Sequence, residues 1–241
     1  MTAERLQKLL SACGYGSRRD CEKLIADQSV TINGKIAKLG DKADFQTDKI
    51  RILGKLIDSK KSPKTYIALN KPTGVLSDIK DARNRKIVTD LVDINDYVFI
   101  VGRLDYRSEG LILLTNDGDV ANKLTHPRYQ HEKEYHVLIN RKPSAKQLEL
   151  WRNGVQIKGG YKTLPADLEK LRSSSDGTWL RIVLSEGKKR QIREVGKSLG
   201  LEVKRIIRTR IGPIELGTLK HGQWRYLTDG EIKNLKEICS V

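Results

Sequence analysis

Two apolar runs enclose a short polar loop, and this stretch constrains the chain more than any other. The runs span residues 98–101 and 111–114, and the loop at 102–110 reads Gly-Arg-Leu-Asp-Tyr-Arg-Ser-Glu-Gly. Short apolar runs bounded by turn residues are typical of buried strands, and glycine allows the backbone to turn tightly. The pattern predicts that two strands hold Asp105 at the rim of a buried sheet. Taken alone, an aspartate in a turn often only accepts backbone hydrogen bonds.

The charge balance points to a polyanionic partner. The chain has 46 Lys plus Arg against 30 Asp plus Glu, a formal net charge of +16. An excess of this size is typical of proteins that bind nucleic acid. An anionic membrane is the alternative, but no apolar stretch approaches the ~18 residues of a spanning helix. No basic amphipathic helix has a large aromatic face either. We therefore expect a nucleic-acid partner and no membrane association.

The cysteines and histidines carry no pattern of a disulfide framework or a metal site. Cys13, Cys21 and Cys239 form no Cys-x-x-Cys pair, and the four histidines show no metal-ligand spacing with them. The N-terminal residues lack the apolar core of a signal peptide. We expect a protein of the reducing cytoplasm, without a bound metal.

Residues 1–52 are predicted to form a small separate domain. Apolar residues over 6–13 follow helical spacing, and Ser17 begins a second helix with a weak capping box. A strand is expected over 30–32, followed by an Asn-Gly hairpin turn. Basic residues that lie on the outer faces are candidates for RNA contact: Arg5, Lys8, Arg18, Arg19 and Lys23.

These segments together resemble the S4 RNA-binding domain. The matching patterns are Arg5-Leu6-x-Lys8-Leu9-Leu10, Gly14-x-Gly16-Ser17-Arg18-Arg19 and Val30-Thr31-Ile32-Asn33-Gly34-Lys35. The resemblance implies contact with RNA through the two helices and the strand that follows, and it implies no catalysis. The polar residues 53–64 are predicted to be a flexible linker.

Residues 65–241 are predicted to form an α+β domain. Strands and helices alternate there without the regularity of βαβ units, so we expect a mixed, mainly antiparallel sheet flanked by helices. The expected strands are 66–69, 98–101, 111–115, 134–139 and 179–184, and the expected helices are 119–124, 144–153, 191–199 and 228–238.

Positive charge is densest between residues 188 and 210, which hold nine Lys or Arg and two Glu. Ile192, Val195 and Leu199 fit the buried face of a helix, so part of this segment belongs to the core. The basic side can neutralise several phosphates, which gives affinity but little sequence readout.

Three parts of this domain, in this order, resemble the ribosomal-RNA pseudouridine synthases of the RsuA and RluB type. They are the Gly-Arg-Leu-Asp loop with its continuation to Gly118, the Lys133-Glu134-Tyr135 strand start, and Gly187-x-x-Arg-Gln-Ile-Arg193. With the S4 pattern in front, the resemblance covers nearly the whole chain. Lys188-Lys189 is a departure, because members often carry Arg-Asn there, and we expect altered RNA contacts from it rather than lost catalysis.

The resemblance implies a role for each matching residue. Asp105 is the catalytic carboxylate, and Arg193 is the ion-pair partner that keeps it ionised. Tyr135 stacks on the target base, and its hydroxyl is a candidate for the proton step at C5. Arg103 helps to displace the base, which must leave the stack before C1′ can be reached. Further RNA contacts are expected from Lys71, Lys133, Lys188, Lys189 and Arg190.

The chemistry of pseudouridylation fits this residue set. The reaction breaks the N1–C1′ bond of a uridine and rejoins the base through C5, without redox change or net hydrolysis, so no cofactor is expected. The carboxylate can attack C1′ or assist removal of a sugar proton, and the sequence leaves both open. A glycoside hydrolase would need two carboxyl groups ~5–10 Å apart. Glu109, the nearest second acid, stands at a variable position of the family pattern, so we do not pair it with Asp105.

The sequence leaves several functions to be weighed. The leading prediction is a monomeric enzyme that acts on ribosomal RNA, free or in a pre-ribosomal particle, with the large subunit favoured by residues 131–135. The alternatives are a small-subunit synthase, a non-catalytic ribosome-assembly factor, and an RNA glycosylase that would release free uracil.

Overall fold

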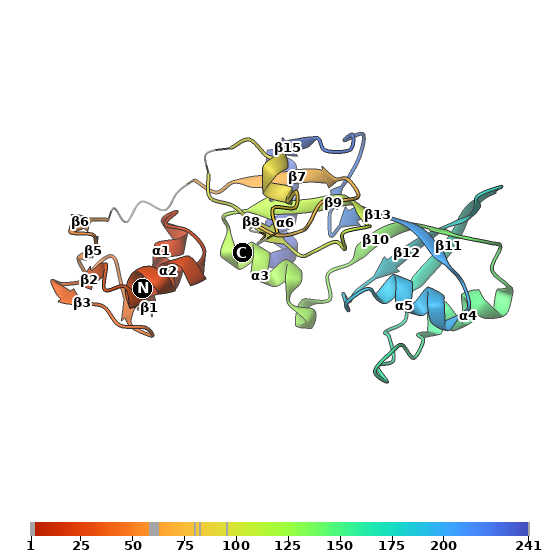
Figure 1. The fold of residues 1–241 in the computed structure, drawn as a ribbon, viewed down its shortest axis with the longest axis horizontal. Helices are drawn as coiled ribbons and strands as arrows, with labels where there is room; N and C mark the ends of the chain where they lie inside the picture. The colour runs from red at the N-terminus through yellow and green to blue at the C-terminus, as the bar shows by residue number, and fades with distance from the viewer. Residues whose placement is uncertain (1–2, 58–62, 80, 82, 95, 241) are drawn as a thin grey trace. The chain divides into compact units, whose positions relative to one another are not determined.

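Figure 1 shows the computed structural model, which describes residues 3–57, 63–79, 81, 83–94 and 96–240. The chain divides into two compact units. The first contains residues 1–65, 94–99 and 116–118, and the second contains residues 66–93, 100–115 and 119–241. Within the described residues, no helix is long and apolar enough to cross a membrane.

The first unit packs two helices against small sheets. The helices are α1 (Leu6–Ala12) and α2 (Arg18–Ala26). One sheet has the order β3 (Lys35–Ile36), β2 (Val30–Ile32), β5 (Ile50–Ile52), β6 (Lys55–Leu56), and β1 (Glu4–Arg5) pairs with β4 (Lys42–Ala43). The predicted capping box is confirmed, because Ser17 and Asp20 each accept a backbone hydrogen bond from the other. The Asn33-Gly34 turn has the positive φ angles, 51° and 83°, that a tight hairpin requires.

The start of the predicted linker differs from the structure. Leu53 and Gly54 form a hairpin turn with positive φ angles, and β6 pairs with β5 directly after it. Ile57 is buried in the core of the first unit. The residues at the start of the predicted linker therefore belong to the hairpin between β5 and β6. Residues 58–62 of the predicted linker lie outside the described residues.

In the second unit, the described strands form one large sheet. Its order is β11 (Asp167–Ser174), β12 (Gly177–Leu184), β10 (Lys133–Ile139), β13 (Val203–Ile211), β9 (Glu109–Thr115), β7 (Tyr66–Lys71), β15 (Trp224–Tyr226). Two further strands pair with interior strands off this order, β14 (Ile214–Glu215) with β13 and β8 (Phe99–Val101) with β9. The β9–β13 pair is parallel, whereas the other described pairings of the main order are antiparallel. The predicted α+β class is confirmed.

The helices of the second unit are α3 (Gly118–Thr125), α4 (Ala145–Asn153), α5 (Gln191–Ser198) and α6 (Asp229–Cys239), with short 3-10 turns at Val88–Leu91 and Pro127–Tyr129. Figure 1 shows α4 and α5 on one side of the strands β10, β12 and β13. Trp151 of α4 and Ile192 and Val195 of α5 join the core there. Ser144 and Thr228 cap α4 and α6 with complete capping boxes.

Two long strands were missed by the sequence analysis. Strand β11 is exposed along most of its length, and only Leu168 is buried, so it has no alternating apolar pattern. Strand β13 lies inside the basic segment, where its charges suggested a surface. Both were hidden because pairing with neighbouring strands, and not apolar patterning, defines them.

Candidate active site

The loop that carries Asp105 is held between two paired strands, as the sequence predicted. Strand β8 ends at Val101 and pairs with β9, which begins at Glu109. Gly102 has a φ of 73° at the turn out of β8. The Ser77 hydroxyl accepts a hydrogen bond from Leu104 N at 3.0 Å and donates one to Leu104 O at 2.8 Å. The residue before Asp105 is thereby fixed from both sides, by a serine that the sequence analysis did not single out.

A cleft of about 670 Å³ opens in front of this loop. This volume falls within the range of small-molecule sites and can take a flipped nucleoside. The residues that line it come from the Asp105 loop, the segment 124–131, the start of β10 and the 184–192 segment. The sequence-predicted residues among them are Arg103, Asp105, Lys133, Tyr135, Lys188, Lys189 and Arg190.

The carboxylates of the cleft differ in their partners. Among the described residues, those that line it are Asp78, Asp105 and Glu186. Glu186 is buried, and Tyr161 Oη at 2.5 Å, Gln191 Nε2 at 2.8 Å and a backbone N–H all donate to it. In the described part of the chain, no hydrogen bond or ion pair engages the Asp105 carboxylate, so it is available to a substrate.

Arg193 lies behind the loop and does not pair directly with Asp105. Its guanidinium donates to Val203 O at 2.8 Å and to Arg107 O at 3.3 Å. Burial lowers the pKa of Arg193, and the Asp105 charge acts in the opposite direction, so the two groups interact electrostatically. Within the described residues, no ion pair shorter than 4.0 Å joins them. Arg193 therefore acts on Asp105 through long-range electrostatics, and the predicted direct ion pair between them is not observed among the described residues.

Lys71 occupies a different position from the one expected of a phosphate contact. Its side chain is 0% exposed at the end of β7, and Nζ donates to Ser108 O at 2.7 Å and to Pro72 O at 3.0 Å. Burial lowers the pKa of Lys71 to about 8. The ammonium group therefore supports the Asp105 loop from inside and cannot reach an RNA backbone in this structure.

Strand β10 brings two predicted residues into the cleft. Lys133 and Tyr135 stand two positions apart, so both side chains face the same side of the sheet. Lys133 Nζ donates to His131 O at 2.8 Å, and burial followed by the charge of Arg208 lowers the pKa of Lys133 to about 8. Tyr135 is 8% exposed and packs in the core under the cleft.

The basic loop at 187–190 is held by groups that the sequence analysis missed. Glu186 anchors its start, and Arg190, with a φ of 56°, is the N-cap of α5. Lys188 Nζ lies 4.2 Å from the centre of the Tyr161 ring, a cation–π contact at the surface. In the sequence, the signal that could have indicated this anchor was a single glutamate directly before the Gly187-Lys188-Lys189 run.

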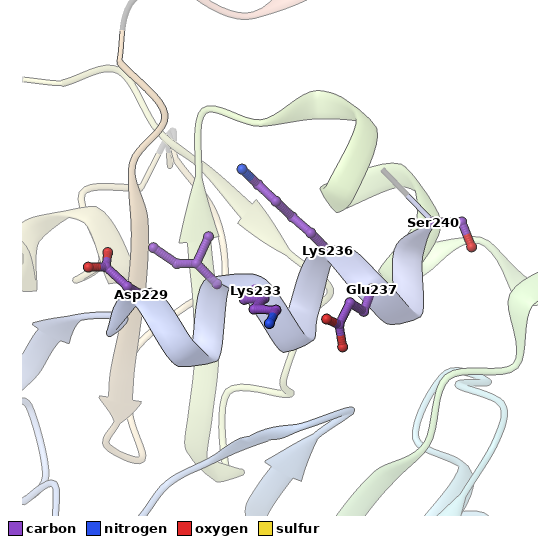
Figure 2. Close-up of a pocket in the computed structure, with 6 residues that line it drawn as sticks. Asp229, Lys233, Lys236, Glu237 and Ser240 are labelled. Atoms are coloured by element: carbon purple, nitrogen blue, oxygen red, sulfur yellow. The ribbon is translucent and has the colours of Figure 1, made fainter.

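The candidate RNA contacts of the first unit are mostly exposed. Arg5, Arg18, Arg19 and Lys23 are exposed on β1 and α2, whereas Lys8 is half-buried and pairs with Glu4 at 2.5 Å. A separate hollow follows one side of α6 in the second unit, where Asp229 and Glu237 flank Lys233 and Lys236 (Figure 2). It shares no residue with the cleft. In the described part of the chain, no three His, Cys, Asp or Glu side chains group as metal ligands.

The fold and the site together define an RNA-modifying enzyme, with a nucleoside-sized cleft, one open carboxylate and a net charge of +16. Residues 65–197 match the RNA pseudouridylate synthase family, and residues 4–48 match the S4 domain. The chain therefore belongs to the RNA pseudouridylate synthase family, in the form that carries an S4 domain at the N-terminal side.

Similar proteins support this assignment over the full chain. An uncharacterized RNA pseudouridine synthase of Aquifex aeolicus is 39% identical over 238 residues, which cover 98% of this chain and 94% of that protein. The ribosomal large subunit pseudouridine synthase B of Bacillus subtilis is 36% identical, covering 98% and 97%. A crystal structure of a pseudouridylate synthase aligns with a TM-score of 0.70 and 30% identity over 96% of this chain and 99% of that one. The family resemblance and the enzyme class predicted from the sequence are confirmed.

Proposed function

We propose that this enzyme isomerises a uridine of large-subunit ribosomal RNA to pseudouridine, with Asp105 as the catalytic carboxylate. The observation that carries the proposal is the open carboxylate at the cleft, on a loop that Ser77 holds through the backbone of Leu104 and that is flanked by the charges of Arg193 and Lys71. Opposite charge close to a carboxyl group favours its ionised form. An ionised carboxylate can attack C1′ or take part in removal of a sugar proton.

The other cleft residues have roles that agree with this reaction. Tyr135 and Arg103 line the cleft together with Asp105, which supports a role for Tyr135 in stacking on the flipped base and for Arg103 in displacing it. Glu109 is buried and pairs with Arg205 at 2.8 Å and with His221 at 3.1 Å. Since Glu109 does not line the cleft, a hydrolase arrangement of two carboxylates has no support from it.

The choice of large-subunit RNA rests on the Bacillus subtilis relative, which bears that substrate in its name. A small-subunit target remains an outcome of the test. We further propose that the enzyme works as a monomer in the reducing cytoplasm.

The direct test is Asp105→Asn, followed by pseudouridine mapping of both ribosomal RNAs from cells that carry only the variant. We expect one or more large-subunit pseudouridines to disappear, because the amide can neither attack C1′ nor accept a proton. Persistence of every modification would refute the role of Asp105. Loss of a small-subunit site alone would redirect the proposal, and free uracil with abasic RNA would indicate a glycosylase instead.

The S4 domain is proposed to supply a second contact with the same RNA, since linked modules raise affinity through effective concentration. Exposed arginines that contact phosphates give salt-dependent binding. The double variant Arg18→Gln, Arg19→Gln should weaken RNA binding and flatten its dependence on salt. Its single-turnover rate at saturating RNA should equal that of the wild type. An unchanged Kd at moderate salt would contradict this contact.

A further inference from the structure

Arg208 is a buried cation that the roles assigned so far leave unexplained. It lines the cleft from β13 and is 2% exposed. Its Nε donates to Leu111 O at 2.7 Å, and its Nη1 donates to Arg103 O at 3.4 Å. Its Nη2 is buried and has no acceptor among the described residues. A buried charged donor without an acceptor is unfavourable, so a functional reason is expected.

The chain makes space for Arg208 with a glycine. Gly110 of β9 lies beside Arg208 in the parallel β9–β13 pair. A Cβ at Gly110 would stand 2.3 Å from Arg208 O and 2.5 Å from Arg208 N, and the φ of Gly110 is 106°. The close approach of these two strands therefore places Arg208 directly behind the Asp105 loop, where it binds the carbonyl of Arg103.

Lys133 is a second cation beside Arg208. Both side chains line the cleft from neighbouring strands, since Tyr135, two residues after Lys133 on β10, stands opposite Arg208 on β13. The charge of Arg208 also contributes to the lowered pKa of Lys133. The neighbouring arginines of β13 have carboxylate partners, Glu109 for Arg205 and Glu132 for Arg210. Among the described residues, Arg208 and Lys133 have none. Two adjacent cations that line a cleft without a counter-anion are suited to a ligand that becomes negative.

We propose, resting on the function proposed above, that Arg208 and Lys133 stabilise the uracil anion as it leaves C1′. When the N1–C1′ bond breaks, its electron pair stays on the uracil and spreads to O2 and O4. The sugar meanwhile either bonds to Asp105 or loses its C2′ proton. The C5–C1′ bond then forms as the Asp105–C1′ bond breaks or as C2′ regains its proton. The C5 proton leaves and N1 takes up a proton, so the product is an isomer. Positive charge fixed in advance is effective because it needs no reorganisation at the moment of cleavage.

A phosphate contact would behave differently from this role. A phosphate carries its charge before, during and after the reaction, so its partner contributes to binding and not to the chemical step. A residue that stabilises the leaving base acts only in the transition state. Replacing that residue therefore lowers the rate of the chemical step and leaves RNA binding unchanged. The two roles are therefore separable by measuring Kd and the single-turnover rate independently.

The test uses the full-length protein and in vitro transcribed ribosomal RNA. Arg208→Gln and Lys133→Met should each lower the single-turnover rate by about 10²–10³-fold, with unchanged Kd for the RNA. Arg152→Lys is the matched control, since Arg152 also donates Nε and Nη2 to a backbone carbonyl, Leu168 O at 3.1 and 2.8 Å, but lies outside the cleft. The control should keep the wild-type rate.

A second substrate separates electrostatic stabilisation from a structural effect. Fluorine at C5 withdraws electrons and stabilises the uracil anion by itself. In RNA that carries 5-fluorouridine, measured as loss of the fluorinated nucleotide, the rate deficit of both variants should shrink by about tenfold. Lys133→Met keeps the test valid if Arg208→Gln does not fold, because Lys133 is only half-buried.

Three outcomes would overturn the inference. A raised Kd with an unchanged rate would make the pair a phosphate contact. An equal deficit on uridine and 5-fluorouridine RNA would reduce the two residues to structural support. If the wild type forms pseudouridine and both variants do so at the same rate, this inference alone is refuted. If the wild type forms no pseudouridine, the proposed function is refuted as well.

Discussion

Replacing Gly110 by alanine is expected to destabilise the sheet at the junction that positions the active-site loop. The new Cβ would meet the backbone of Arg208 at 2.3 Å and 2.5 Å, and the residue has a φ of 106°. A side chain in the left-handed region costs about 1–2 kcal/mol. Overpacking against backbone costs typically about 1–3 kcal/mol more. Gly110→Ala should therefore lose about 2–5 kcal/mol, a large part of the ~5–15 kcal/mol stability of a domain.

The assay is thermal unfolding of Gly110→Ala beside a matched control, Gly217→Ala. Gly217 also has a positive φ, 57°, but its Cβ would meet nothing within 4 Å, so the control isolates the backbone term. At about 2–4 °C per kcal/mol, Gly110→Ala should lower Tm by roughly 4–20 °C, and the control by only a few degrees. The single-turnover rate of Gly110→Ala should also fall, because Arg208 and the Asp105 loop shift together. Equal Tm losses in the two variants would refute the close-approach argument.

Three further predictions concern a cap and two titrating groups. Ser17→Ala removes the hydrogen bond from Asp20 N at 3.0 Å, costs about 1 kcal/mol and should speed amide hydrogen exchange in the first turn of α2, without changing catalysis. Arg225 lowers the pKa of Glu231 to about 2, so this pair stabilises the fold above the usual carboxyl pKa and loses its effect as pH falls through 2. Glu231→Gln should therefore lower the free energy of unfolding near neutral pH by about 1 kcal/mol, as for a partly exposed pair, and should match the wild type in strong acid, measured by the Tm of both proteins across pH. Burial lowers the pKa of Lys133 to about 8, so its charge is lost as pH rises through that value. The single-turnover rate should fall on that side, and Lys133→Arg should remove the fall.

Several parts of the fold were predictable because they are set by neighbours in the sequence. The capping boxes at Ser17 and Thr228 and the Asn33-Gly34 turn follow from short-range hydrogen bonds and φ preferences. The strands on either side of Asp105 follow from their apolar runs. In each case, the residues that determine the structure lie within a few positions of one another.

Other parts depend on partners that lie far away in the chain. Strand β11 has one buried residue, Leu168, and exists because it pairs with β12. The Leu53-Gly54 turn resembled the start of a linker until β6 was seen to pair with β5. Sequence periodicity reports burial, and these segments are held by backbone hydrogen bonds that periodicity does not register.

The sequence by itself determined the α+β class, the family and the two strands that bound the Asp105 loop, because motifs and apolar patterns are local. Only the tertiary structure decided which cations surround that carboxylate. Lys71 and Arg208 read as surface charges in the sequence, yet they are 0% and 2% exposed. Their burial depends on the parallel β9–β13 pair, which Gly110 permits. Whether a lysine or arginine is buried depends on how closely strands that are distant in the sequence approach each other, and no local pattern encodes that distance.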